Sequence, residues 1–214
     1  MTRLLLATRN TGKLAELRRI LGETLPPDGP HRIELVGLDD VPSYPEAPET
    51  GLTFAENAVE KAREGCRYTG LPTVADDSGL AVDPLNGMPG VFSARWSGRT
   101  GADRDRANLE LVLAQIADLP DEHRGAAFVC AAALVLPEGW PGEREHVVEG
   151  QQRGRLLRTP RGSGGFGYDP IFLGDGQAQT NAELSPSAKD AISHRGQAFR
   201  ALAKVCAEVL PKNV

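Results

Sequence analysis

Long apolar runs are absent from this sequence of 214 residues. No stretch approaches the roughly 20 apolar residues that a membrane-spanning helix needs. The apolar run at residues 4–7 is also too short to form the core of a signal peptide. We therefore expect a cytoplasmic protein with no membrane partner.

Cysteine is scarce as well, with three residues in the chain, Cys66, Cys130 and Cys206. They lie far apart in apolar surroundings, which is typical of buried, reduced thiols. No CxxC or HxxxH spacing is present, so the sequence offers no zinc site. A GxSxG motif is also missing, which leaves covalent acyl transfer with little support.

Positive charge is in deficit, because the formal net charge is -5. Such a chain lacks the broad positive field that binding to a nucleic acid polymer requires. A small phosphate ligand held by a few local cations remains compatible with this balance. The 40% hydrophobic and 25% charged residues are those of a globular protein, and the length fits one domain or two closely joined lobes.

The order of expected elements indicates an α/β fold with a mixed sheet. Thr53 and Glu56 form a capping box, which predicts a helix that runs as far as Gly70. Asp103 and Ser185 are expected to cap two later helices, and the C-terminal helical region should break near residues 193–196. Strands are expected at residues 4–8, 33–38, 73–75, 126–136, 146–157 and 171–173.

The first polar motif lies between a short strand and a helix. A helix start presents backbone N–H groups and a positive dipole, which together with a lysine favour an anion. Ala7 and Leu14 replace the glycine and the Ser/Thr of a P-loop, so a P-loop NTPase is disfavoured. A plain turn with a solvated lysine remains the alternative. The motif comprises Thr8, Arg9, Asn10, Thr11, Gly12 and Lys13.

The second motif is Asp76-Asp77-Ser78-Gly79, which we expect at the end of the strand at residues 73–75. Two adjacent carboxylates are hard to bury without a cation, because each raises the pKa of the other. Neighbours on a strand point to opposite faces, so one carboxylate could meet a metal while the other braces the loop. Oxygen ligands of this kind suit Mg²⁺. The alternative is an Asp-rich turn that bonds its own backbone.

Two further motifs could bind a nucleoside. In the glycine-rich segment at residues 162–170, Phe166 or Tyr168 could stack on a base and Asp169 could accept hydrogen bonds. Near the C-terminus, Lys189, His194 and Arg195 are donors suited to phosphate or carbonyl oxygens. Taken alone, each motif can also be a simple turn or a solvated helix face.

Read in order, five segments resemble the inosine triphosphate pyrophosphatase or Ham1-like family: ATRNTGK, ETGLTFAENAVEKA, VADDSGLAVDPLNGMPGVFSARWSG, GGFGYDPIF and AELSPSAKDAISHRGQAF. The resemblance spans nearly the whole chain and implies one domain over residues 1–214. Its fold would be a long curved mixed β-sheet with flanking helices and two lobes around a nucleotide-binding cleft, in a homodimer. It also implies Mg²⁺-dependent hydrolysis of ITP, dITP and XTP to a monophosphate and pyrophosphate, which would remove deaminated purines from the nucleotide pool.

The resemblance also implies a role for each motif. Asp77 would be the catalytic residue and a magnesium ligand, acting either as the base or as the metal holder. Residues 8–13 would hold the triphosphate, although Arg9 stands where the family has glycine and points either to solvent or to phosphate. Glu49, which precedes TGLTF, is favoured over Glu46 as a second metal ligand. The remaining substrate contacts would be Ser78, Phe166, Gly167, Tyr168, Asp169, Lys189, His194 and Arg195.

Three other interpretations are open. A Maf-like pyrophosphatase would share the strand, the phosphate loop and the acids but would not need the SHRG segment to read a 6-keto purine. A nucleotide sensor would bind without cleavage, but bare carboxylates beside phosphates weaken binding unless Mg²⁺ bridges them. An RNA-binding module is disfavoured by the acidic balance and the 5% aromatic content.

Overall fold

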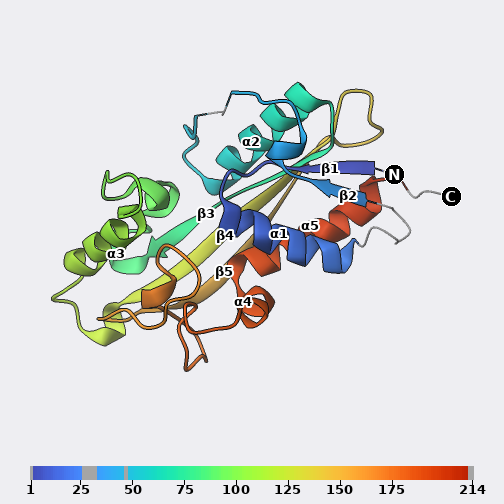
Figure 1. Ribbon diagram of the computed structural model, residues 1–214. Coiled ribbons are helices and arrows are strands. Elements are labelled where there is room, and N and C mark those ends of the chain that lie inside the picture. Colours follow the sequence, from blue (N-terminus) through green and yellow to red (C-terminus); the bar gives the residue numbers. More distant parts are fainter. Residues whose placement is uncertain (1, 26–32, 46–47, 212–214) are drawn as a thin grey trace. The chain divides into compact units, whose positions relative to one another are not determined.

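The computed structural model describes residues 2–25, 33–45 and 48–211. Its six strands form one sheet in the order β2-β1-β3-β4-β5-β6 (Figure 1). Strand β1 (Thr2–Leu6) is parallel to β2 (Ile33–Val36) and to β3 (Thr73–Val82), whereas β5 (Glu145–Leu156) is antiparallel to β6 (Phe172–Gly174). The expected α/β class with a mixed sheet is therefore confirmed.

Five α-helices accompany the sheet in the described part of the chain: α1 (Thr11–Thr24), α2 (Phe54–Thr69), α3 (Arg104–Gln115), α4 (Pro186–Ile192) and α5 (His194–Val209). The capping box of Thr53 and Glu56 is present at the start of α2. Ser185 caps α4, and the chain breaks at Ser193 before α5, as predicted. Asp103 occupies the N-cap position of α3, as predicted, but its side chain makes no capping hydrogen bond.

The chain divides into two compact units, and each is described by itself. Unit 1 comprises residues 1–77, 130–150 and 195–214, and unit 2 comprises residues 78–129 and 151–194. Strands β3, β4 (Gly125–Val135) and β5 contribute residues to both units. In the described residues, no helix combines the length and the apolar character needed to cross a bilayer.

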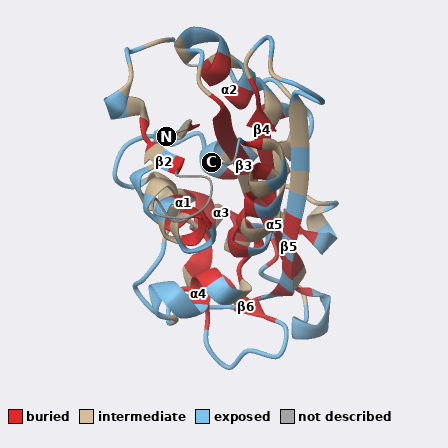
Figure 2. Ribbon diagram, turned by 90° about the vertical axis from the view of Figure 1, so that its right-hand side faces the viewer, coloured by how far each residue is buried: buried red, intermediate tan, exposed pale blue. Residues whose placement is uncertain are grey.

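Unit 1 is built on both faces of β4. Cys130, Ala132 and Leu134 pack in one cluster with apolar side chains of α1 and α5, which lie side by side in Figure 1. Ala131 and Ala133 alternate with them and pack with the small side chains of α2. A strand buried on both faces reads as a continuous apolar run, which is why residues 126–136 were recognisable as a central strand. Figure 2 shows this burial along β4.

Unit 2 has a separate apolar core in which α3 packs against side chains of β3, β4 and β5. The C-terminal end of α3 is held by Arg124, a residue with only 2% of its surface exposed. Its guanidinium donates to the carbonyl oxygens of Ile116 (2.6 Å), Leu156 (3.0 Å) and Leu157 (3.2 Å). Arg124 therefore satisfies three backbone acceptors that would otherwise have no hydrogen-bond partner.

One predicted boundary is wrong in a way that concerns the site. Strand β3 does not stop at Ala75 but continues to Val82, so Asp76 and Asp77 lie inside the strand rather than at its end. The strand can continue because each carboxylate has a cationic or amide partner, and because Leu80 and Val82 bury their side chains completely. The Asp-rich turn is excluded by the same observation. All three cysteines are free and buried, as expected.

Candidate functional site

The loop at residues 8–13 leads from β1 into α1 in unit 1. Asn10 is the N-cap of α1, and its side chain accepts a hydrogen bond from the Lys13 backbone N–H at 3.1 Å. The Thr8 hydroxyl accepts from the Asn10 backbone N–H at 3.3 Å. No acidic residue lies in the first turn, so the positive end of the helix dipole is not neutralised there. The predicted helix start is thus formed, with Asn10 as its cap, and its binding of an anion stays a prediction.

The Arg9 side chain makes a contact that the sequence did not predict. Its side chain is exposed, and its guanidinium donates to the Tyr44 carbonyl oxygen at 3.2 Å. The residue therefore connects the loop at residues 8–13 to the segment that leads toward Glu49. Neither of the two expectations, solvent or phosphate, included this contact.

The Lys13 side chain forms a buried ion pair with Asp76. The two charged groups are 2.7 Å apart, and the Asp76 side chain has no exposed surface. Burial alone would raise the pKa of Asp76, but the Lys13 and Arg195 cations outweigh it and hold this pKa below its usual value. Asp76 therefore stays ionised and anchors the Lys13 ammonium at the start of α1.

Asp77 lies on the other face of β3, toward α2. Its carboxylate accepts from the Asn57 amide at 3.0 Å and from the Lys61 ammonium at 3.3 Å. Burial raises the pKa of Asp77 above its usual value, although the Lys61 and Lys13 cations oppose the increase. A raised pKa of this kind is what a carboxylate that takes up or shares a proton requires.

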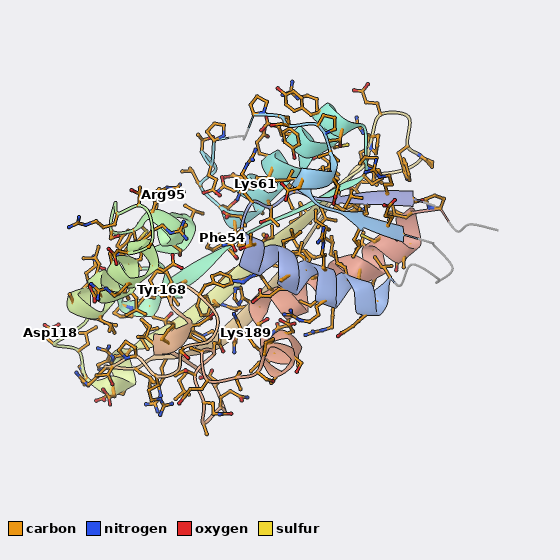
Figure 3. The ribbon with its side chains drawn as sticks, viewed as in Figure 1. Phe54, Lys61, Arg95, Asp118, Tyr168 and Lys189 are labelled. Carbon is orange, nitrogen blue, oxygen red and sulfur yellow. The ribbon has the colours of Figure 1, made fainter. Side chains whose placement is uncertain are left out.

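The Lys61 ammonium also pairs with Glu49. Lys61, labelled on α2 in Figure 3, therefore contacts the two carboxylates that were predicted to bind the metal. Burial lowers the pKa of Lys61, but Asp77 and Glu49 outweigh it, so the pKa is raised and Lys61 stays charged. Glu46, the alternative metal ligand, lies outside the described residues.

The donor set around Lys61 fits a hard divalent cation. Glu49, Asp76 and Asp77 place three carboxylates against two ammonium groups, those of Lys13 and Lys61. The excess negative charge leaves room for another cation. No group of three or more His, Cys, Asp or Glu side chains in the described ranges is arranged to cage a metal. Two carboxylates are nevertheless the usual protein share of a Mg²⁺ site that substrate phosphates complete.

Arg195 belongs to unit 1 and forms a buried ion pair with Glu16 of α1 at 2.8 Å. Glu16 was not among the predicted site residues. A buried arginine without a carboxylate is costly, so the pair holds the guanidinium in a defined position at the start of α5. Arg195 also contributes to the lowered pKa of Asp76, which places its charge in the same region of unit 1.

Unit 2 holds the glycine-rich loop and the residues around it. The Asp169 carboxylate accepts from the Phe166 backbone N–H at 2.9 Å and from the Lys189 ammonium at 2.7 Å. The Lys189 ammonium also lies over the Phe166 ring, 5.0 Å from its centroid. Gly165, with a φ of 69°, leaves space for the Asp169 side chain, which a Cβ at this position would meet. The structure therefore brings Phe166, Asp169 and Lys189 together, as predicted.

His194 and Ser78 are two further predicted substrate contacts in unit 2. His194 is 1% exposed, and its ring stacks on Phe128, with 4.8 Å between centroids and 8° between planes. Ser78 is the first residue of this unit and is half-buried in β3. The alternative of a solvated helix face is excluded for Lys189 and His194, since both are almost fully buried.

Asn57 and Lys61 are the site residues that sequence reasoning missed. Both were inside the ENAVEKA segment, four residues apart, and the capping box had already located the start of their helix. Residues at this spacing lie on one helix face. The next residues, Ala58 and Ala62, pack against the sheet. A polar pair directly beside them therefore indicated a polar partner such as Asp77.

The role of Lys61 can be tested through pH. Its charge lowers the pKa of Asp77, so removing it in Lys61→Met should raise that pKa further. We expect the acid limb of the profile of kcat/KM against pH to move to higher pH. Lys61→Arg should keep the limb in place, as should Arg67→Met, which removes an exposed cation from the same helix. A limb at the same pH in Lys61→Met would contradict this electrostatic role.

The fold and this cluster together define the class of the protein. It is an α/β protein whose polar site combines lysines, carboxylates and a helix start, the groups that phosphoryl-transfer enzymes use. The family model of the Ham1 family matches residues 4–205, and the chain belongs to the Ham1 family.

Relatives support this assignment over the whole length. The chain is 60% identical over 211 residues to a dITP/XTP pyrophosphatase of Streptomyces coelicolor, a match that covers 98% of this chain and 100% of the relative. It is similar to a crystal structure of a nucleoside-triphosphatase, dITP/XTP pyrophosphatase, from Mycobacterium abscessus, with 59% identity, coverage of 94% and 97%, and a TM-score of 0.73. A HAM1 protein from Coxiella burnetii has 40% identity, coverage of 97% and 100%, and a TM-score of 0.82.

Proposed function

We propose that this protein hydrolyses ITP, dITP and XTP to the nucleoside monophosphate and pyrophosphate, and so removes deaminated purines from the nucleotide pool. The observation that carries the proposal is the cluster of unit 1, in which Lys13, Lys61 and Asp77 gather near the start of α1. Membership of the Ham1 family and the dITP/XTP pyrophosphatases among its relatives support the substrate class. A single functional domain made of both units is part of the proposal.

The triphosphate is assigned to unit 1. Lys13 and the start of α1 bind phosphate oxygens, because the ammonium and the helix dipole both favour negative charge. Asp76 holds Lys13 in place through their 2.7 Å ion pair. These groups stabilise the charge that grows on the phosphate oxygens during the reaction, which is the main source of catalysis in phosphoryl transfer.

Asp77 is assigned to the attack of water on the α-phosphorus. Its carboxylate orients the water and accepts its proton, and the raised pKa suits this role. Glu49 and Asp77 would hold Mg²⁺, which when bound neutralises charge on the pyrophosphate leaving group. Lys61 keeps the two carboxylates in place before that ion arrives.

The base and sugar are assigned to Phe166, Asp169, Lys189 and His194 of unit 2. Inosine and xanthosine carry a keto oxygen at position 6, which donor groups can satisfy. Adenine carries an amino group there, which would leave donor facing donor at a cost of about 1 to 3 kcal/mol for each unpaired group. Rejection of GTP must come from its 2-amino group meeting a close wall or an unmatched donor.

The proposal predicts a definite order of substrates. With Mg²⁺ present, we expect kcat/KM for ITP and XTP to exceed the value for ATP by about 10- to 100-fold or more, as one or two unpaired groups would cause. GTP should also be a poor substrate. The measurement is pyrophosphate release from the four nucleotides in parallel. Equal turnover of all four would contradict the selectivity, and orthophosphate as the product would favour a different reaction.

The homodimer rests on the family resemblance and the cytoplasmic location on the composition of the sequence, and both stay predictions. Sedimentation of the purified chain would test the first of these. A mass of one chain at micromolar concentration would contradict it.

A further inference from the structure

Ser93 connects two of the predicted substrate-binding segments of unit 2. It lies in the 3-10 helix η3 (Gly90–Arg95) and is 7% exposed. Its hydroxyl accepts from the Leu80 backbone N–H at 2.9 Å and donates to the Gly90 carbonyl at 2.6 Å. Its own carbonyl accepts from the Tyr168 hydroxyl at 2.8 Å. One residue thus contacts both β3, the strand that contains Ser78, and the glycine-rich loop.

The strand and η3 are in very close contact at this point. A Cβ built on Gly79 would meet the Ser93 hydroxyl oxygen, and it would lie 2.6 Å from the Gly90 carbonyl oxygen. Real side chains do not tolerate such a distance to backbone, so glycine is required at position 79. The segment that begins at Ser78 therefore packs directly against η3, and Ser93 is its hydrogen-bonding partner.

Tyr168 is placed to hold the loop rather than to stack on a base. Tyr168, labelled in Figure 3, is 4% exposed and belongs to the apolar core with Leu80, Ile171 and Phe172. Burial raises the pKa of Tyr168, since a phenolate would lose its hydration, so the hydroxyl remains a donor. Phe166 is then the aromatic side chain of this loop that remains to face a base.

The neighbours of Tyr168 are held in the same way. The Gly167 backbone N–H donates to the Asp105 carboxylate at 3.2 Å, and the Phe166 backbone N–H donates to Asp169 at 2.9 Å. Asn108 of α3 also donates to the Ser93 carbonyl at 3.2 Å, so this acceptor keeps one partner if Tyr168 is altered. Three consecutive residues of the loop are thus fixed by groups of unit 2.

We propose that the hydrogen bond from Tyr168 to Ser93 is a positioning contact that sets the nucleoside-binding loop at residues 165–169 relative to Ser78, and so determines affinity for the nucleoside part of the substrate. The inference rests on the proposed function. In this role, Tyr168 and Ser93 act on the nucleoside through Phe166, Asp169 and Ser78 and not by direct contact. Loss of the contact should weaken nucleoside binding and leave the groups of unit 1 that bind phosphate intact.

The test is the Tyr168→Phe variant of the full chain, which removes one oxygen and keeps the ring in the core. We expect KM for ITP to rise about 5- to 10-fold, as the loss of one hydrogen bond would cause, with kcat changed by less than about twofold. Inhibition by pyrophosphate, which lacks a nucleoside, should be unchanged. Tyr68→Phe, which removes the hydroxyl of a half-exposed tyrosine on α2, is the matched control and should leave KM and kcat as they are.

Ser93→Ala provides a second variant, because it removes the hydroxyl but keeps the carbonyl. The Ser93 hydroxyl holds the Leu80 backbone N–H, and the Ser93 carbonyl holds Tyr168, so the two hydrogen bonds are consecutive links between β3 and the loop. We expect a rise in KM of similar size, and in the double variant an effect smaller than the product of the two, because breaking either link already releases the loop. A lower melting temperature and lower kcat with unchanged KM would show a merely structural role and overturn the inference. Fully multiplicative effects would also overturn it. Absence of pyrophosphate release by the parent chain would instead overturn the proposed function, and the inference with it.

Discussion

In the Asp77→Asn variant, we expect kcat for ITP to fall by about 10²- to 10⁴-fold, the contribution usual for a general base. The substitution removes the charge at nearly constant shape. Asn57 and Lys61 would still face the side chain, but it could neither accept a proton from water nor serve as a full metal ligand. The measurement is steady-state pyrophosphate release at saturating ITP and Mg²⁺.

A measurement of thermal stability distinguishes this loss of activity from unfolding of the variant. Because the pKa of Asp77 is raised in the folded protein, the folded state binds its proton more tightly than the unfolded chain does. Ionisation of Asp77 therefore lowers stability as the pH rises through this pKa. At neutral pH, Asp77→Asn should melt no lower than the parent. Asp83→Asn, at a half-exposed carboxylate paired with Arg153, should keep full activity. Near-parental kcat in Asp77→Asn would contradict the assignment.

The second large effect concerns stability alone. Replacing Arg124 by methionine keeps much of the side-chain volume but leaves the carbonyls of Ile116, Leu156 and Leu157 without this donor. Each unsatisfied buried acceptor costs about 1 to 3 kcal/mol. We expect the free energy of unfolding to fall by about 3 kcal/mol or more, measured by chemical denaturation of the parent and the variant.

Arg158 offers a matched control at the same end of α3. Its guanidinium donates to the carbonyls of Ala117 (3.2 Å) and Leu119 (2.8 Å) and pairs with Asp121. Its side chain is 52% exposed, so water can replace it at these acceptors. Arg158→Met should therefore cost less than about 1 kcal/mol. Equal losses in the two variants would show that burial of Arg124 is not what makes it important.

The fold was accessible from the sequence wherever a local pattern and tertiary packing agree. The continuous apolar run at residues 126–136 predicted a strand buried on both faces, and β4 is one. The capping box of Thr53 similarly located α2. The end of β3 was misplaced because Asp76 and Asp77 look like turn residues. Their partners Lys13 and Lys61, which allow burial, come from distant parts of the chain.

In the candidate site, too, local motifs were predictable and contacts between distant residues were not. The motifs at residues 8–13, 76–78 and 166–169 carry their own signals, and the structure pairs Lys13 with Asp76 in unit 1 and Lys189 with Asp169 in unit 2. The sequence could not show that Lys61 contacts both Glu49 and Asp77, because that depends on where the segment before α2 runs. Nor could the sequence show which of Phe166 and Tyr168 can stack on a base. Only the structure shows that Tyr168 is buried and that its hydroxyl donates to Ser93.

The central claim is that water attacks the α-phosphorus and that pyrophosphate leaves. Hydrolysis of ITP in ¹⁸O-labelled water, followed by mass spectrometry of both products, tests it directly. The account predicts one ¹⁸O atom in the inosine monophosphate and none in the pyrophosphate. Label in the pyrophosphate, or release of labelled orthophosphate with inosine diphosphate, would place the attack at another phosphorus and contradict the account.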